Sequence, residues 1–174
     1  MKLMLDVIKK RRSIRIYQSK EVEEEKIQEI LKAAMFAPSA KHCRSWEFIV
    51  IKDKKTINKL SQVKAGASFA KDAPIVLVLC ADENLDSLWI EDLSIAAAHI
   101  YLEATNQGLG TCYVQINGRS TPDGDDTEDY IRKIIKAPAN IRILCLMPIG
   151  YPAEKPGEHQ DSEFDPKKIH QEKW

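Results

Sequence analysis

The sequence lacks an excess of charge of either sign and lacks any long apolar run. Lys plus Arg and Asp plus Glu number 26 each, so the formal net charge is zero. Proteins that bind nucleic acids or membrane surfaces usually carry a basic excess, and this balance argues against both classes. No uncharged apolar stretch reaches about 18 residues, the length that a membrane-spanning helix needs. We therefore expect neither a nucleic-acid partner nor a membrane partner.

Cysteine is scarce and shows no paired spacing. The four cysteines, Cys43, Cys80, Cys112 and Cys145, contain no Cys-x-x-Cys pair, a pattern that indicates reduced thiols in a cytosolic protein. The basic residues from Lys9 to Arg12 follow the apolar N-terminal residues, whereas a secretory signal has the opposite order. These features predict a cytoplasmic protein.

The sequence also lacks the common motifs of metal sites, serine hydrolases and dinucleotide-binding domains. The four histidines form no His-x-x-x-His pair, and the sequence has no Gly-x-Ser-x-Gly elbow and no Gly-x-Gly-x-x-Gly fingerprint. These absences disfavour a metal site, a serine hydrolase and a Rossmann dinucleotide site. We expect His99, inside a long apolar stretch, to be a hydrogen-bonded core residue. A chain without a cluster of acid, base and nucleophile fits chemistry that belongs to a bound cofactor.

Hydrophobic periodicity predicts helices and strands that interleave along the chain. We expect helices from the N-terminus to residue 10 and over 23–36, 54–63, 66–71, 85–107 and 127–136, with strands over 46–51, 75–81, 111–116 and 141–147. Strands 75–81 and 141–147 are apolar throughout, which predicts that both of their faces are buried. The pattern indicates one layered domain of the α/β or α+β class over residues 1–174, without linker or repeat.

Two short segments could contact a ligand. Arg11, Arg12, Ser13 and Arg15 place three guanidinium groups and a hydroxyl within five residues. Guanidinium forks bind phosphate oxygens bidentately, although a solvated basic turn at a helix C-terminus explains the same cluster. The loop Ala37-Pro38-Ser39-Ala40 consists of small residues that let backbone approach a flat ring, or it is an ordinary turn.

In series, these motifs resemble the FMN-dependent nitroreductase family. The resemblance is carried by Arg11-Arg12-Ser13-Ile14-Arg15, Ala37-Pro38-Ser39-Ala40 followed by Trp46-Glu47-Phe48, Glu91-Asp92, Gly108-Leu109-Gly110-Thr111-Cys112-Tyr113, Ile149-Gly150-Tyr151-Pro152 and Glu172-Lys173-Trp174. It extends over nearly the whole chain in the family's order. It implies an α+β sandwich with a mostly antiparallel central sheet flanked by helices.

The resemblance also implies a homodimer that exchanges terminal segments and holds FMN in its interface. Arg11, Arg12, Ser13 and Arg15 would then bind the phosphate, the ribityl chain and the pyrimidine edge. Pro38, Ser39 and Ala40 of the partner subunit would line the isoalloxazine, and Asn117-Gly118 would offer a backbone N–H to flavin N5. The tail 153–174 ends with Phe164, Ile169 and Trp174, which we expect to dock on the other subunit.

The implied activity is hydride transfer from NADH or NADPH, through FMN, to a small acceptor such as a nitroaromatic or a quinone. Flavin destruction, reductive dehalogenation and a non-catalytic flavin carrier remain as alternatives on the same scaffold. The sequence departs from the family where His42 and Arg44 replace an Asn and a Gln, and we expect His42 to donate to the flavin. Residues 157–163 are acidic where relatives often supply a cation to the phosphate.

Overall fold

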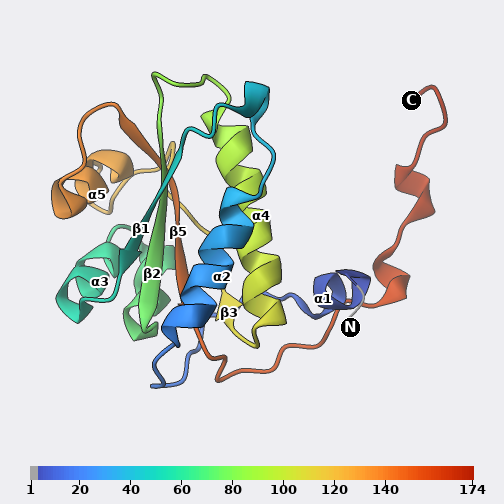
Figure 1. Cartoon of the computed structure of the whole chain (residues 1–174). Helices are drawn as coiled ribbons and strands as arrows, with labels where there is room; N and C mark the ends of the chain where they lie inside the picture. The colour runs from blue at the N-terminus through green and yellow to red at the C-terminus, as the bar shows by residue number, and fades with distance from the viewer. Residues whose placement is uncertain (1–3) are drawn as a thin grey trace.

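The computed structural model describes residues 4–174 and arranges them around a five-stranded sheet (Figure 1). In spatial order the strands are β1 (Trp46–Ile51), β2 (Ile75–Asp82), β5 (Ile141–Gly150) and β3 (Gly110–Thr111), and β4 (Val114–Gln115) also pairs with β5. All of these pairings are antiparallel. The structure confirms the predicted α+β class with a mostly antiparallel central sheet.

Helices cover both faces of the sheet (Figure 1). One face carries α2 (Glu24–Met35) and α4 (Trp89–Asn106), and the other carries α3 (Lys54–Ser61), the 3₁₀ helix η2 (Ala65–Asp72) and α5 (Thr127–Ile135). Among residues 4–174, no helix combines the length and the apolar character that crossing a bilayer requires.

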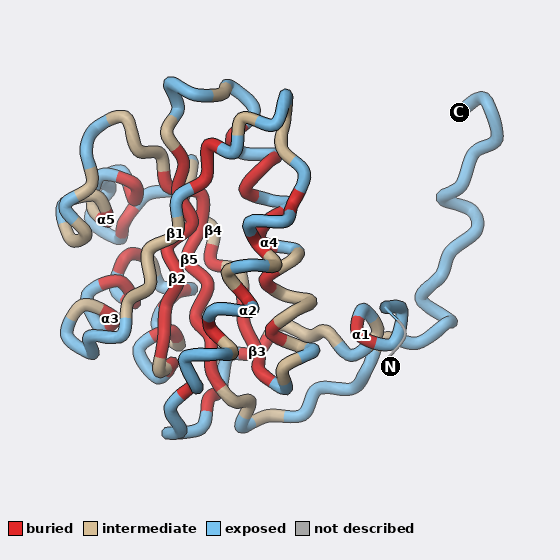
Figure 2. The backbone as a smooth tube through the Cα atoms, viewed as in Figure 1, coloured by how far each residue is buried: buried red, intermediate tan, exposed pale blue. Residues whose placement is uncertain are grey.

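Strand β2 contributes to two hydrophobic cores, because successive side chains of a strand point to opposite faces. Ile75, Leu77 and Leu79 join the core beneath α2 and α4, whereas Val76, Val78 and Cys80 join the core beneath α3, η2 and α5. Figure 2 shows the resulting buried band through the middle of the sheet. This confirms the prediction that residues 75–81 form a strand buried on both faces.

The largest differences from the predicted elements are at two places. The strand expected over 111–116 is divided into β3 and β4, because the Tyr113 N–H donates to the Tyr101 hydroxyl at 2.7 Å and not to β5. The helix expected from residue 85 begins at Trp89. Before it, the Asp82 carboxylate and carbonyl accept from Asn84 and Leu85, which forms a turn that delays the helix.

The N-terminal helix and the segment after the last strand meet beside the body of the protein. The short helix α1 (Met4–Lys10) lies next to the segment that follows β5, and that segment continues through the short 3₁₀ helices η3 (Asp161–Glu163) and η4 (Pro166–Lys168). Beyond α1 the C-terminal tail extends away from the sheet and its helices (Figures 1 and 2). Phe164 and Ile169 are 69% and 52% exposed, and Trp174 is fully exposed. Their docking on a second subunit stays a prediction.

Candidate functional site

The arginine segment follows α1 and runs beside β3. Ser13 forms a parallel bridge with Thr111, and the Ile14 N–H donates to the Thr111 carbonyl at 3.0 Å. Ile14 is buried against Gly110, where a methyl group in place of the glycine hydrogen would come within 2.4 Å of the Ile14 side chain. Because an extended backbone alternates its side chains, the segment presents two different sides to its surroundings.

Arg11, Ser13 and Tyr101 form the first side. The Arg11 guanidinium carbon lies 5.2 Å from the centre of the Tyr101 ring, and the Ser13 hydroxyl is 3.2 Å from the Tyr101 hydroxyl. Burial raises the pKa of Tyr101, while hydrogen bonds from Ser13 and the Tyr113 N–H oppose this shift. Tyr101 therefore stays a neutral phenol at neutral pH and orients Ser13.

Arg15 is placed near this group by a different aromatic residue. Its guanidinium carbon lies 5.9 Å from the centre of the Phe69 ring on η2, and the side chain is exposed. The Glu154 carboxylate accepts from the Arg15 and Ile16 backbone N–H groups at 2.5 and 3.0 Å. Glu154 thus pairs with backbone and leaves the Arg15 guanidinium available to a ligand.

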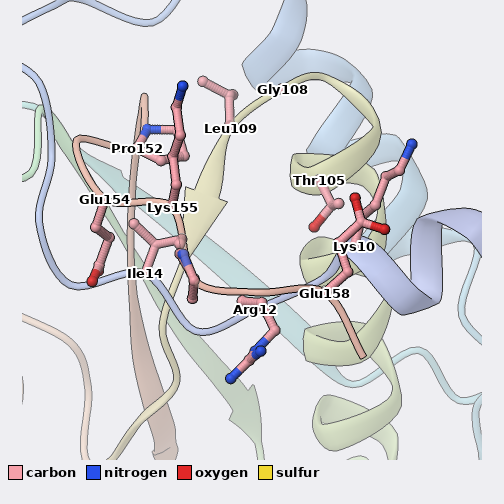
Figure 3. Close-up of a pocket in the computed structure, with 11 residues that line it drawn as sticks. Lys10, Arg12, Ile14, Thr105, Gly108, Leu109, Pro152, Glu154, Lys155 and Glu158 are labelled. Atoms are coloured by element: carbon pink, nitrogen blue, oxygen red, sulfur yellow. The ribbon is translucent and has the colours of Figure 1, made fainter. Parts of the chain in front are cut away.

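Arg12 faces another direction. It lines a pocket together with Lys10, Ile14 and the end of α4 (Figure 3). It also donates to the Gly157 carbonyl. Lys155 adds a third cation to this pocket, but Glu154 and Glu158 also line it. The structure therefore separates Arg12 from Arg11 and Ser13, although the sequence places them side by side.

Asn117 and Gly118 lie in a tight turn after β4. The Arg119 N–H donates to the Ile116 carbonyl at 3.1 Å, and Gly118, third in the turn, has a φ of 68°, which favours glycine. The Asn117 N–H donates to the Leu144 carbonyl at 3.1 Å. Within the described residues the Gly118 N–H has no hydrogen-bond partner, so Gly118 is the better donor of the predicted pair.

The first turn of α5 holds this turn in place. The Thr127 hydroxyl donates to the Ile116 carbonyl at 2.6 Å, and the Asn117 amide donates to the Glu128 carboxylate at 2.8 Å. Glu128, 3% exposed, also accepts from Arg142 at 2.9 and 3.0 Å and from the Ile143 N–H at 2.9 Å. The Asn117 side chain is therefore used for structure, and the backbone is left to contact a ligand.

The loop that carries Pro38, Ser39, Ala40 and His42 includes the 3₁₀ turn η1 (Ala40–His42) and is shaped by hydrogen bonds to its backbone. The Ser39 hydroxyl accepts from the Arg44 N–H at 3.1 Å, and the buried Asp92 carboxylate accepts from the Ala40 N–H at 2.9 Å. His42 has a φ of 58° and is exposed, as is Pro38. The loop thus presents these groups to solvent from a constrained backbone.

One protomer does not bring this loop to the arginine segment. The loop is tied to α4 at Asp92 and the arginine segment at Tyr101, and nine residues of helix between them span about 13.5 Å. The loop also reaches the end of α4 that is opposite α1 in Figure 1. The resemblance implies that the loop of a second subunit, and not the loop of the same protomer, lies beside the arginine segment.

Sequence reasoning assigned no role to Tyr101, Asp92 or Glu128. Asp92 carries a weak signal, since it is one of the few charged residues of a largely apolar helix, and the structure buries it. Tyr101 and Glu128 carry no signal in the sequence, because their partners are distant along the chain. His99 makes the predicted hydrogen bond, since its Nδ1 is 2.9 Å from the Ala33 carbonyl, but it is only half-buried and is not the core residue that we expected.

Taken together, the fold and the site define a class of α+β protein suited to hold an anionic ligand beside a basic segment and an open backbone amide. The chain matches the model of the Nitroreductase family over residues 8–89 and 61–151. The chain therefore belongs to the nitroreductase family and is an oxidoreductase.

Individual relatives agree with this assignment. An FMN-dependent nitroreductase from Clostridium difficile R20291 superposes with a TM-score of 0.95, is 44% identical, and the match covers 98% of this chain and 99% of that one. A protein of Methanothermobacter thermautotrophicus, provisionally named NADH dehydrogenase/NAD(P)H nitroreductase, is 39% identical over 98% of this chain and 87% of its own. The iodotyrosine deiodinase of Thermotoga neapolitana is 22% identical over 94% of this chain and 96% of its own.

Proposed function

We propose that this enzyme binds FMN and uses it to pass a hydride from NADH or NADPH to a small oxidised acceptor such as a nitroaromatic or a quinone. The proposal rests on one observation: Arg11 and Ser13 both lie beside Tyr101, and the Arg15 guanidinium is exposed on the same extended segment. The FMN-dependent relative at 44% identity supports the choice of cofactor.

The residues present fit the chemical groups of FMN. Arg11 and Arg15 offer planar forks of donors that suit a phosphate or the oxygens of a pyrimidine edge. The Ser13 hydroxyl suits a ribityl hydroxyl, and the unpartnered Gly118 N–H suits a ring nitrogen. No heavy atom lies within 4 Å of the position that a Gly118 Cβ would occupy, so this amide has open space beside it.

The assembly proposed for this activity is a homodimer with FMN at the interface. Pro38, Ser39, Ala40 and His42 of one subunit would then approach the arginine segment of the other. Asp92 holds the Ala40 amide and so fixes the backbone that would meet the flavin ring. Arg12, which faces the separate pocket of Figure 3, would contribute through its charge more than through direct contact.

When bound, FMN supplies the hydride acceptor and donor of both half-reactions. The protein's part is to bind and orient: the arginine segment anchors the polar end, and the Gly118 amide and the Pro38–Ala40 loop fix the ring. Holding the reactants in place in this way can lower a barrier by roughly 7 to 11 kcal/mol.

The first test is the visible spectrum of the purified protein, followed by addition of NADH or NADPH without oxygen. We expect the absorption bands of oxidised flavin, bleached by the nucleotide and restored by menadione or nitrofurazone. Diiodotyrosine and free FMN in the same assay separate dehalogenation and flavin destruction from the proposed reaction. A colourless protein that takes up no added FMN would overturn the proposal.

The second test is Arg15→Ala. Loss of a charge-assisted contact should weaken FMN binding by about 1.5 to 3 kcal/mol, which is roughly 10- to 150-fold in the dissociation constant. Lys133→Ala is the matched control, because it removes one positive charge from an exposed position on α5. Equal affinities of Arg15→Ala and wild type, measured by quenching of flavin fluorescence, would argue against this role of Arg15.

A further inference from the structure

The acidic segment 157–163 lies against the basic segment that contains Arg11. The His159 N–H donates to the Lys9 carbonyl at 2.9 Å, and the Lys9 ammonium is 2.6 Å from the Asp161 carboxylate. The Gly157 carbonyl accepts from Arg12. Both backbone and side chains therefore fix this part of the tail to residues 9–12, even though it is distant in sequence.

The His159 ring lies between Arg11 and Glu163. Its Nε2 is 3.0 Å from Nη2 of Arg11, and its Nδ1 is 2.7 Å from Oε2 of Glu163. A guanidinium group can only donate hydrogen bonds, so the Nε2 atom must accept. The ring proton then resides on Nδ1 and is donated to the Glu163 carboxylate, which fixes the tautomer of His159.

Glu163 is itself held in position. Its second carboxylate oxygen, Oε1, accepts from the Gln160 N–H at 2.8 Å, and the Glu163 N–H donates to the Gln160 carbonyl at 2.9 Å. The hydrogen bond from His159 lowers the pKa of Glu163, so the carboxylate stays ionised at neutral pH. The chain of contacts Glu163–His159–Arg11 thus starts from a fixed carboxylate and ends at a guanidinium.

We infer that His159, oriented by Glu163, is a positioning residue that fixes the Arg11 guanidinium for binding the phosphate of FMN. This inference rests on the proposed FMN-dependent function. One N–H of Arg11 is used by His159, and the remaining donors of the guanidinium stay available for the phosphate oxygens. Fixing a flexible side chain before binding reduces the entropy that binding costs. The acidic segment thereby supports the phosphate site, at the place where the resemblance led us to expect a further cation.

The test compares FMN dissociation constants of the full-length protein and its variants by flavin fluorescence. His159→Ala and Glu163→Ala should each weaken FMN binding about three- to tenfold, the cost of ordering one long side chain. His159→Gln should recover most of the affinity, because its amide oxygen can accept from Arg11. Asp161→Asn is the matched control: it removes an ion pair of the same segment but no partner of Arg11, and its affinity should equal that of the wild type.

A double-mutant cycle with Arg11→Ala decides between positioning and direct contact. If His159 acts through Arg11, His159→Ala has no further effect on FMN affinity in the Arg11→Ala background. An equal, additive loss in both backgrounds would overturn the inference, as would wild-type affinity of His159→Ala. A wild-type protein that binds no FMN would instead refute the proposed function, so the two failures can be told apart.

Discussion

At the scale of single residues, Glu128 links the sheet to the turn that presents Gly118. Burial raises the pKa of this carboxyl group, but hydrogen bonds from Arg142, the Ile143 N–H and Asn117 outweigh it and hold the pKa below its ordinary value of 4.5. A group with a lowered pKa in the folded state adds stability above its unfolded pKa, and this stability is lost as the pH falls through the folded pKa.

We therefore predict that Glu128→Gln destabilises the protein at pH 7 by about 3 kcal/mol or more, because Arg142 loses its buried partner. The difference from wild type should begin to shrink below about pH 4.5, where the carboxyl group of the unfolded chain becomes protonated, and should be lost as the pH falls through the lower pKa of the folded state. Urea unfolding of the wild type and the variant, at pH 7 and at a pH below about 4.5, measures this difference in the free energy of unfolding. Glu83→Gln is the control, since Glu83 is a more exposed partner of Arg142 and such pairs contribute about 0 to 1 kcal/mol. A pH-independent difference would contradict the prediction.

At the scale of elements, Gly110 sets the distance between β3 and the arginine segment. A Cβ atom at Gly110 would lie 2.4 Å from Cγ1 and 2.7 Å from Cβ of Ile14. The Cβ atom belongs to the rigid base of the side chain, so the whole segment must shift to relieve the overlap. This close approach explains why a glycine follows Leu109 at the start of β3.

We predict that Gly110→Ala lowers the free energy of unfolding by about 1 to 3 kcal/mol, the usual cost of overpacking. It should also weaken FMN binding, because Arg11 and Ser13 move together with Ile14. Gly66→Ala is the matched control: no heavy atom lies within 4 Å of its Cβ position, and its stability should stay within about 0.5 kcal/mol of wild type. Chemical unfolding and FMN titration of both variants provide the measurements, and wild-type values for Gly110→Ala would contradict the argument.

Most elements could be predicted because their signals are local. Asp53 and Asp126 cap α3 and α5 with their side chains, and the apolar run of β2 is visible in the sequence. The break between β3 and β4 could not be predicted, because it depends on a hydrogen bond between Tyr113 and Tyr101. The separation of Arg12 from Arg11 has the same kind of cause: the neighbours that decide which way each side chain faces come from distant segments.

At the scale of the whole molecule, the candidate site is divided between two places. The arginine segment lies near Tyr101 in the C-terminal part of α4, and the Pro38–His42 loop lies near the beginning of this helix. The family resemblance supplied the expectation that two subunits meet, and the residues alone did not. The structure of the protomer gives a physical reason to expect a second subunit, because apolar side chains of its tail are exposed to solvent. Docking these side chains on another chain would remove their apolar surface from water.

The tail gives the last prediction, which concerns assembly. The triple variant Phe164→Ser, Ile169→Ser and Trp174→Ser should weaken the proposed dimer at least tenfold, because burying one large apolar side chain is worth about 1.5 to 3 kcal/mol. All three side chains are exposed in the protomer, so the substitutions should leave the secondary structure of the subunit unchanged. Lys167→Ser with Lys168→Ser is the control from the same exposed tail. Sedimentation across a dilution series measures the dimer, and an unchanged dissociation constant would show that these residues do not dock on a partner.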